Sequence, residues 1–184
     1  MGFRLSVQAL LPIAKETLVY GSADAGHEFE SSNEEAKRMM ECIGEKLYLK
    51  PHICVDAHGT EHTIIGPADI EIHQGIGKHA YLYVIDAARL MPPDVNVNAL
   101  TSVFYQQFRP EFMKWYKKPL SSDAYSRFGL SGSEIHNKEV LEASRVLREE
   151  RVPKFAQMIK PPNKKDKTLN WVSVEMQHRG INAR

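Results

Sequence analysis

Acidic and basic side chains follow an apolar segment near the middle of the sequence. Residues 81–85 read YLYVI, which predicts a buried strand, and Asp86 and Arg89 come soon after it. An acidic residue at the end of a strand is a common ligand for the magnesium ion of phosphotransfer enzymes. Asp69 or His73, in the segment before, could supply the second ligand. One hypothesis for these residues is therefore a magnesium-nucleotide site.

The same residues could instead hold a structural corner. Polar side chains at the end of a strand commonly cap the following turn or form partly buried ion pairs. Asp86 would then pair with Arg89 or Arg109, and Glu111 would belong to the same group. The sequence has no GK[ST] or GxGxxG loop that would hold phosphate, and no GxSxG motif. The structural corner is therefore the preferred hypothesis, and a phosphotransfer enzyme that uses Asp86 and Asp69 is the alternative.

Histidines are concentrated in one part of the chain, with five of the eight between residues 52 and 79. Cys54, His58 and His62 are spaced four apart, so on a helix His58 and His62 would share a face. Zinc requires three or four converging ligands. However, Gly59 and the sequence HGTEHTII are typical of a turn that enters a strand, where positions four apart lie about 13 Å from each other. We therefore expect no metal site and no cofactor.

The composition is that of an ordinary globular domain. The chain has 184 residues, 42% of them hydrophobic, which is enough for a single domain with one core over residues 1–184. A net charge of +1 argues against a globally electrostatic nucleic-acid or membrane binder. No window approaches the roughly 20 apolar residues of a membrane span, so we expect no membrane insertion. With only two cysteines and no secretory signal, a reduced, cytoplasmic setting is the simplest expectation.

Hydrophobic periodicity predicts strands first and helices afterwards. Alternation over residues 5–13 predicts a strand, and the other predicted strands are TLVYG, HICVDA, HTII and YLYVID. The predicted helices are SSNEEAKRMMECIGEKLYL, capped by Ser31 or Ser32, then ALTSVFYQQF, PEFMKWY, SEIHNKEVLEASRVLREERVPKFAQMIK and TLNWVSVEMQH. Pro153 should end or kink the longest of these helices. The aromatic residues expected in the core are Tyr81, Tyr83, Phe104, Tyr105, Phe108, Phe112 and Trp115. The fold class is therefore α+β, with a small antiparallel sheet in the N-terminal half packed against a mostly helical C-terminal half.

Basic residues gather toward the C-terminus. Lys164, Lys165 and Lys167 lie in the segment KPPNKKDK, and Trp171 and Arg179 follow. Basic side chains interleaved with an aromatic ring suit single-stranded RNA, because they pair with phosphates and stack on bases. The alternative is a solvated lysine segment, which is what most runs of charge are.

Six segments of the sequence together resemble the central domain of the clustered mitochondria (CLU) family. In order along the chain they are FRLSVQALLPIAKETLVYGSADAG, YVIDAARLMPPD, FYQQFRPEF, PLSSDAYSRF, EVLEASRVLREERVPKF and QHRGINAR. The chain departs from the family pattern at Ile72, where a glycine is usual, and at Gly77 and Lys78, where an acidic residue is usual. By this resemblance the family domain should begin before Phe3 and continue past Arg184.

The resemblance implies a cytoplasmic protein needed for the distribution of mitochondria. It further implies association with messenger RNAs for nuclear-encoded mitochondrial proteins and with the ribosome or the translation initiation machinery, and it supplies no catalytic residues. We therefore expect a non-enzymatic binding or scaffold domain with RNA or protein partners, in which Asp86, Arg89, Arg109 and Glu111 form the structural corner.

Overall fold

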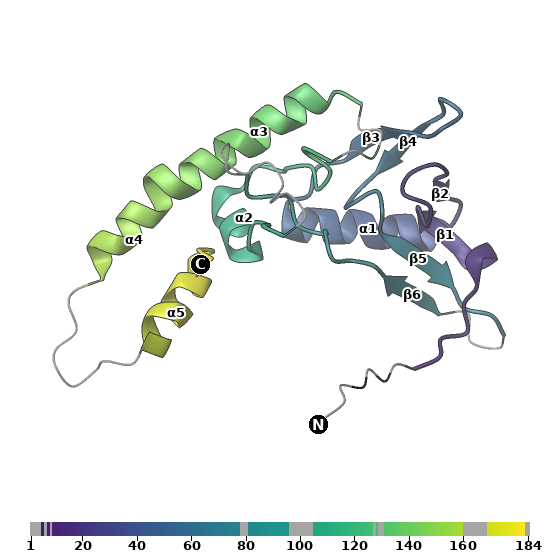
Figure 1. Cartoon of the computed structure of the whole chain (residues 1–184), viewed down its shortest axis with the longest axis horizontal. Helices are drawn as coiled ribbons and strands as arrows, with labels where there is room; N and C mark the ends of the chain where they lie inside the picture. Colours follow the sequence, from purple (N-terminus) through teal and green to yellow (C-terminus); the bar gives the residue numbers. More distant parts are fainter. Residues whose placement is uncertain are drawn as a thin grey trace.

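The fold has a sheet half and a helical half, as the α+β expectation required (Figure 1). The computed structural model describes residues 5, 7, 9–77, 81–95, 105–126, 128, 131–159 and 169–182, with side chains in the last range from residue 172. The N-terminal residues up to β6 build the sheet half. The residues after β6 build the helical half, in which one long helical rod runs along one side of the molecule (Figure 1).

A four-stranded antiparallel sheet in the order β2-β1-β5-β6 forms the sheet half. Its strands are β1 (Leu18–Gly21), β2 (Glu30–Ser31), β5 (Glu71–Gln74) and β6 (Leu82–Ile85). Ile72 of β5 lies opposite Tyr20 of β1 and Val84 of β6, so it occupies the middle of the sheet and is fully buried.

A separate hairpin, formed by β3 (His52–Val55) and β4 (Glu61–Ile64), confirms the two strands predicted there. Cys54 lies opposite His62 in this pairing. Residues 56–60 form the hairpin tip, where Gly59 has a φ of +84° that favours glycine.

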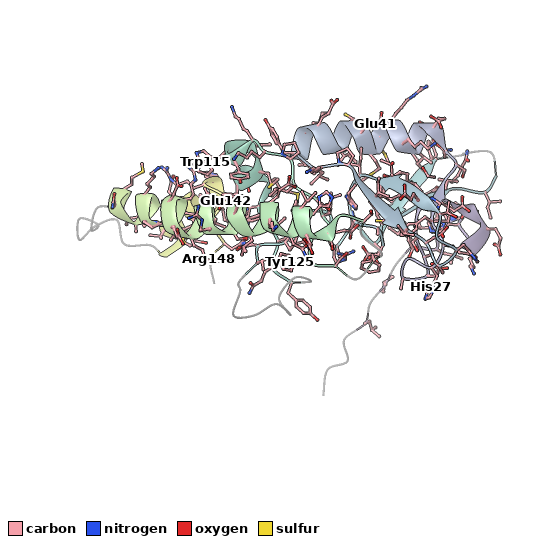
Figure 2. All side chains as sticks on the ribbon, turned by 90° about the horizontal axis from the view of Figure 1, so that it is seen from above. His27, Glu41, Trp115, Tyr125, Glu142 and Arg148 are labelled. Atoms are coloured by element: carbon pink, nitrogen blue, oxygen red, sulfur yellow. The ribbon has the colours of Figure 1, made fainter. Side chains whose placement is uncertain are left out.

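The helix α1 (Glu34–Leu47) covers the sheet half, and the structure confirms its prediction. Asn33 is its N-cap, and the Asn33 side chain accepts a hydrogen bond from the Ala36 amide at 2.9 Å. The expected caps were wrong, because Ser31 belongs to β2 and the helix begins later. In the view from above, α1 with Glu41 runs along one long side of the molecule (Figure 2).

Four helices build the helical half: α2 (Pro110–Tyr116), α3 (Ser133–Val146), α4 (Val152–Met158) and α5 (Leu169–His178). A π-helical turn, Leu147–Arg151, joins α3 to α4 in one continuous rod (Figure 1). Pro153 lies directly after this turn and cannot donate a backbone hydrogen bond, so the irregularity appears as a widened turn rather than as the end of the helix.

Each half has its own hydrophobic core. In the sheet half the core consists of Tyr20, Phe29, Ala36, Met40, Cys54, Ile64, Ala68, Ile70 and Ile72. In the helical half it consists of Val95, Phe108, Phe112, Met113, Leu120, Ala124, Val140, Ala143, Leu147, Phe155 and Ile181. The position of Phe108 and Phe112 in this second core confirms the prediction for these two residues.

The strand predicted over residues 5–13 is not formed among those of its residues that the structure describes. Leu5, Val7 and Leu10 are instead more than four-fifths exposed. The next strand along the chain offers it no free edge, because β1 already has β2 on one side and β5 on the other.

The burial expected for β6 and for part of the aromatic set was also wrong. β6 is the last strand of its sheet, and Tyr81 and Val84 are 63% and 44% exposed. Tyr105 is 89% exposed and lies outside any helix, while Phe104 lies outside the described residues. Among the helices of the described chain, none has the length and apolar character needed to span a membrane.

Candidate functional site

A buried network of ionisable side chains surrounds Asp123, in the segment between α2 and α3. The Asp123 side chain is fully buried. Its Oδ2 accepts hydrogen bonds from His52 Nε2 and from the Ala68 amide, both at 2.8 Å, and its Oδ1 accepts from Arg89 Nη2 at 3.0 Å. Cys54 Sγ lies 4.0 Å from Oδ2. One carboxylate is therefore surrounded by donors from three distant parts of the chain.

The alternation of β3 directs His52 and Cys54 to the same side of the strand. Both are buried, whereas Ile53 between them is exposed, as the two-residue period of a strand requires. The segment that carries Asp123 is aligned beside the start of β3, because the Lys50 amide donates to the Leu120 carbonyl at 2.9 Å.

The segment around Asp123 is itself held by local hydrogen bonds. The Ser121 hydroxyl accepts from the Asp123 amide at 3.1 Å, and the Asp123 carbonyl accepts from the Ser126 amide at 2.9 Å. These turns fix the backbone that carries the carboxylate.

Arg89 extends the network to a second carboxylate. Its Nε and Nη2 donate to the two carboxylate oxygens of Asp69 in a two-point contact, at 2.9 and 2.5 Å. The guanidinium also lies 4.5 Å from the ring centre of Phe128. Burial alone would lower the pKa of Arg89, but Asp69 and Asp123 together raise that pKa above its usual range. Arg89 therefore stays charged and bridges two acids.

The buried histidine of the network uses both ring nitrogens. His52 Nδ1 lies 3.2 Å from the Lys50 carbonyl oxygen, and His52 Nε2 faces the Asp123 carboxylate.

Burial, reinforced by the negative charge of Asp123, raises the pKa of the Cys54 thiol to about 12. Cys54 with this pKa is a neutral thiol at neutral pH.

The network joins the two halves of the fold. Asp69 stands between Ala68 and Ile70 of the sheet core, and Asp123 stands beside Ala124 of the helical core. Two surface hollows, of about 370 and 380 Å³, are lined by other residues: the first lies against α1 and β4, the second against α3 and the chain after α2. The network thus ties two cores together and is not part of either hollow.

The residues predicted for the structural corner lie in two separate places. Arg109 Nε and Glu111 Oε2 are 3.2 Å apart at the start of α2, partly exposed. Arg89 bonds Asp69 and Asp123 in place of the expected Asp86. Asp86 is exposed, has a left-handed backbone with φ of +49°, and forms no ion pair within the described chain. The left-handed turn at Asp86 leaves its side chain in solvent, whereas the Arg89 side chain, three residues later, is buried.

Of the three residues considered as zinc ligands, Cys54 alone reaches a cluster of potential ligands. Within the described part of the chain, His52, Cys54 and Asp123 bring their ligating atoms within 4.8 Å of one another. His62 instead pairs with Asp56 at 3.0 Å, and His58 is exposed at the hairpin tip. The strand conformation separates these histidines from the interior, as expected.

Three of the five RNA-binding candidates, Lys164, Lys165 and Lys167, lie outside the described residues, and so does the side chain of Trp171. Arg179 is described and contacts other parts of the chain. Its Nε lies 3.7 Å from Glu175, and its guanidinium lies 5.6 Å from the ring centre of Phe155.

Sequence reasoning missed the two central residues of the network, His52 and Asp123. The sequence contained almost no signal for Asp123: it is the acid in PLSSDAYSRF, and serine is a residue type found mostly on the surface. Its partner His52 lies 71 positions earlier, and no local pattern connects the two.

Comparison with known proteins identifies relatives of the first half of the chain. Residues 1–97 match the family model described as Clustered mitochondria. Two relatives, each a clustered mitochondria protein homolog, come from Caenorhabditis elegans (30% identical) and Caenorhabditis briggsae (29%), each over 101 residues. A third, from Brugia malayi, is 29% identical over 100 residues.

Each match covers 52% of this chain but only 7–8% of the relative, so the chain corresponds to a small part of the proteins it matches. No solved structure matches the chain at a significant level. The matched range contains His52, Cys54, Asp69 and Arg89 of the network, and Asp123 lies beyond it. Since the family model spans more than half of the sequence, the chain belongs to the clustered mitochondria family.

Proposed function

We propose that this chain is a non-enzymatic binding and scaffold domain. On this proposal it acts in the cytoplasm in the distribution of mitochondria, where it contacts messenger RNAs for nuclear-encoded mitochondrial proteins. The observation that carries the proposal is the closed network around Asp123. A catalytic acid needs a face open to substrate, whereas the oxygens of Asp123 accept from His52, Arg89 and a backbone amide, and the side chain is fully buried.

The geometry gives little support to the alternative, a phosphotransfer enzyme with magnesium on Asp86 and Asp69. Both oxygens of Asp69 accept from Arg89, so a magnesium ion would have to displace a two-point contact. Asp86 lies on the exposed turn after β6.

The ends of the basic segment support a role in RNA binding. Residues 160–168 connect α4 to α5 and contain four lysines and one acidic residue. On either side the chain is anchored, because Arg151 Nε donates to the Arg179 carbonyl at 3.2 Å and Ile181 is buried in the helical core. The helices on either side of the basic segment are therefore joined to each other and to the helical core.

Fluorescence anisotropy of labelled single-stranded RNA, titrated with this chain at several salt concentrations, tests the proposal. We expect binding that weakens steeply with salt, because lysines release counterions from the phosphates. Changing Lys164, Lys165 and Lys167 together to Ala should lower the slope of log affinity against log salt by about 2, since each phosphate contact in a single strand contributes about 0.7.

A matched control removes the same charge elsewhere. Lys114, Lys118 and Lys138 are exposed on α2, just after it, and on α3, so their combined change to Ala should leave the slope unaltered. Equal losses in both triple variants would mean nonspecific attraction and would contradict the proposal. So would an absence of binding together with a thermal shift on magnesium-ATP that Asp86→Asn abolishes, which would favour the enzyme.

A further inference from the structure

Three ligating atoms of different kinds meet at the joint between the two halves: His52 Nε2, Cys54 Sγ and Asp123 Oδ2. Nε2 is 2.8 Å and Sγ is 4.0 Å from Oδ2, and all three side chains are buried. Zinc bonds of about 2.0–2.3 Å at tetrahedral angles place the ligand atoms about 3.3–3.6 Å apart. The two distances to Oδ2 each differ from this spacing by about half an ångström, and Sγ and Nε2 lie within 4.8 Å of each other.

The short contact between His52 Nε2 and Asp123 Oδ2 requires a hydrogen or a metal ion between the two atoms. They are 2.8 Å apart and out of contact with water, and a carboxylate oxygen can only accept. His52 Nδ1 lies 3.2 Å from the Lys50 carbonyl oxygen, so a ring that binds metal through Nε2 would have an acceptor for its Nδ1–H. A metal ion therefore fits this contact as well as a hydrogen does.

The surroundings of the three atoms are those that metal ligands usually have. A ligating imidazole commonly donates its other N–H to a backbone carbonyl, which fixes the orientation of the ring, and the Lys50 carbonyl oxygen lies 3.2 Å from His52 Nδ1. A ligating carboxylate is commonly held through its second oxygen, as Asp123 is by Arg89. The two turns around Asp123 supply further rigidity.

We propose that His52, Cys54 and Asp123 bind one divalent transition-metal ion of the zinc class, with a structural role at the joint between the two cores. One imidazole, one thiolate and one carboxylate suit zinc, whereas an all-oxygen set would suit magnesium or calcium. The ion takes the place of the hydrogen between His52 Nε2 and Asp123 Oδ2, and the Cys54 thiol releases its proton to become the thiolate ligand.

With the ion bound, the charges of the network balance. The divalent ion and Arg89 balance the carboxylates of Asp69 and Asp123 and the Cys54 thiolate, and the imidazole is neutral. The guanidinium of Arg89 does not exclude the ion, because its charge is compensated by Asp69 at 2.9 Å.

Metal analysis of the purified 184-residue chain, prepared without chelator, is the first test, followed by refolding in Zn²⁺ or Co²⁺ because the site is closed to solvent in the folded state. We expect one bound ion per chain. Refolding with Co²⁺ should give a sulfur-to-cobalt charge-transfer band, and X-ray absorption of the zinc form should show one sulfur ligand among nitrogen or oxygen ligands.

The second cysteine of the chain provides a matched control. Cys42 is exposed on α1, so Cys42→Ser should keep both the ion and the band. Cys54→Ser should lose the band and weaken binding by more than about tenfold, since even residues that only support a ligand affect affinity by about 10- to 100-fold. X-ray absorption of the unchanged chain needs no variant, so a Cys54→Ser chain that fails to fold leaves the test intact. A chain refolded with Zn²⁺ that binds no ion, a zinc site without sulfur, or a cobalt band that survives in Cys54→Ser would overturn the proposal and leave a shared proton at this position.

Discussion

Two histidine–aspartate pairs in this chain have nearly the same geometry and very different surroundings. His52 and Asp123, at the joint, are 2.8 Å apart and fully buried, and they lie 71 positions apart in sequence. His62 and Asp56, at the β3–β4 hairpin tip, are 3.0 Å apart, have 20% and 9% of their side chains exposed, and lie six positions apart.

The difference teaches what each pair contributes. Asp56 Oδ1 also accepts from the amides of His58 and Thr60, both at 2.8 Å, so this carboxylate organises its own turn. Asp123 accepts from groups on β3, before β5 and after β6, so its carboxylate holds together elements that have no local reason to meet. A local pair fixes a loop, and a buried long-range pair couples two cores.

Removing the two carboxylates should separate these roles most clearly. Asp123→Ala leaves the charge of Arg89 and the ring of His52 buried without this partner, and we expect it to lower the free energy of unfolding by about 3–5 kcal/mol. Asp56→Ala removes local bonds near water and should lower the free energy of unfolding much less. Urea unfolding of both variants measures the difference. Losses of equal size would contradict the comparison.

Two glycines extend the same contrast to the backbone. Gly21 and Gly59 both have positive φ, of +96° and +84°. A Cβ on Gly21 would lie 1.7 Å from the Ile70 carbonyl oxygen beside Asp69, whereas a Cβ on Gly59 would meet nothing within 4 Å. We expect Gly21→Ala to cost about 2–4 kcal/mol, from strain and overpacking together, and Gly59→Ala to cost about 1 kcal/mol from strain alone. Thermal and urea unfolding would measure both, and a tolerated Gly21→Ala would show that the strand edge can shift.

Arg89 pairs with Asp69 and not with Asp86, and a comparison of variants at these two acids should give a smaller difference in stability. Asp69→Asn keeps one acceptor but removes the charge from a two-point contact, so it should cost about 1–2 kcal/mol. Asp86→Asn changes an exposed residue at φ +49°, a conformation that Asn tolerates, and should stay within about 0.5 kcal/mol. A larger loss for Asp86 than for Asp69 in the same unfolding measurement would restore the corner expected from the sequence.

The same contrast between local and distant contacts decides how much the sequence could predict. The helix α1, the hairpin β3–β4, and α5 follow from short-range periodicity and turn chemistry, and the structure confirms them. The strand predicted over 5–13 rested on a real alternation, but strand pairing is decided by available edges, and both edges of β1 are taken. The exposure of Tyr81 likewise depends on β6 being an edge strand, which only the pairing order shows.

In the buried network, too, sequence patterns did not predict contacts between residues that are distant along the chain. Arg89 was identified by its place after a strand, yet its partners come from 20 and 34 positions away. Cys54 was identified by its spacing to two histidines, while the histidine it approaches is His52, two positions earlier on the same strand face. The sequence could therefore indicate that Arg89 and Cys54 matter, but their partners are decided by tertiary contacts that local spacing does not show.

The smallest expected effect is a pH dependence of stability that comes from Asp56 at the hairpin tip. The hydrogen bond from His62, followed by the amide of Thr60, lowers the pKa of Asp56 to about 2. In the unfolded chain the carboxyl has its ordinary value, near 4, and binds protons more readily there than in the folded state. The stabilisation is therefore complete above about pH 4 and is lost as pH falls toward 2.

Urea unfolding of the original chain and of Asp56→Asn at a series of pH values from 5 to 2 isolates this contribution, because the difference between the two proteins cancels the titration of other carboxyls. We expect the gap between them to narrow as pH falls through this window, because Asn cannot titrate. If this difference in free energy of unfolding stays constant with pH, the contacts of the hairpin do not stabilise the charged form of Asp56. The His62–Asp56 pair would then share only its geometry with the buried His52–Asp123 pair.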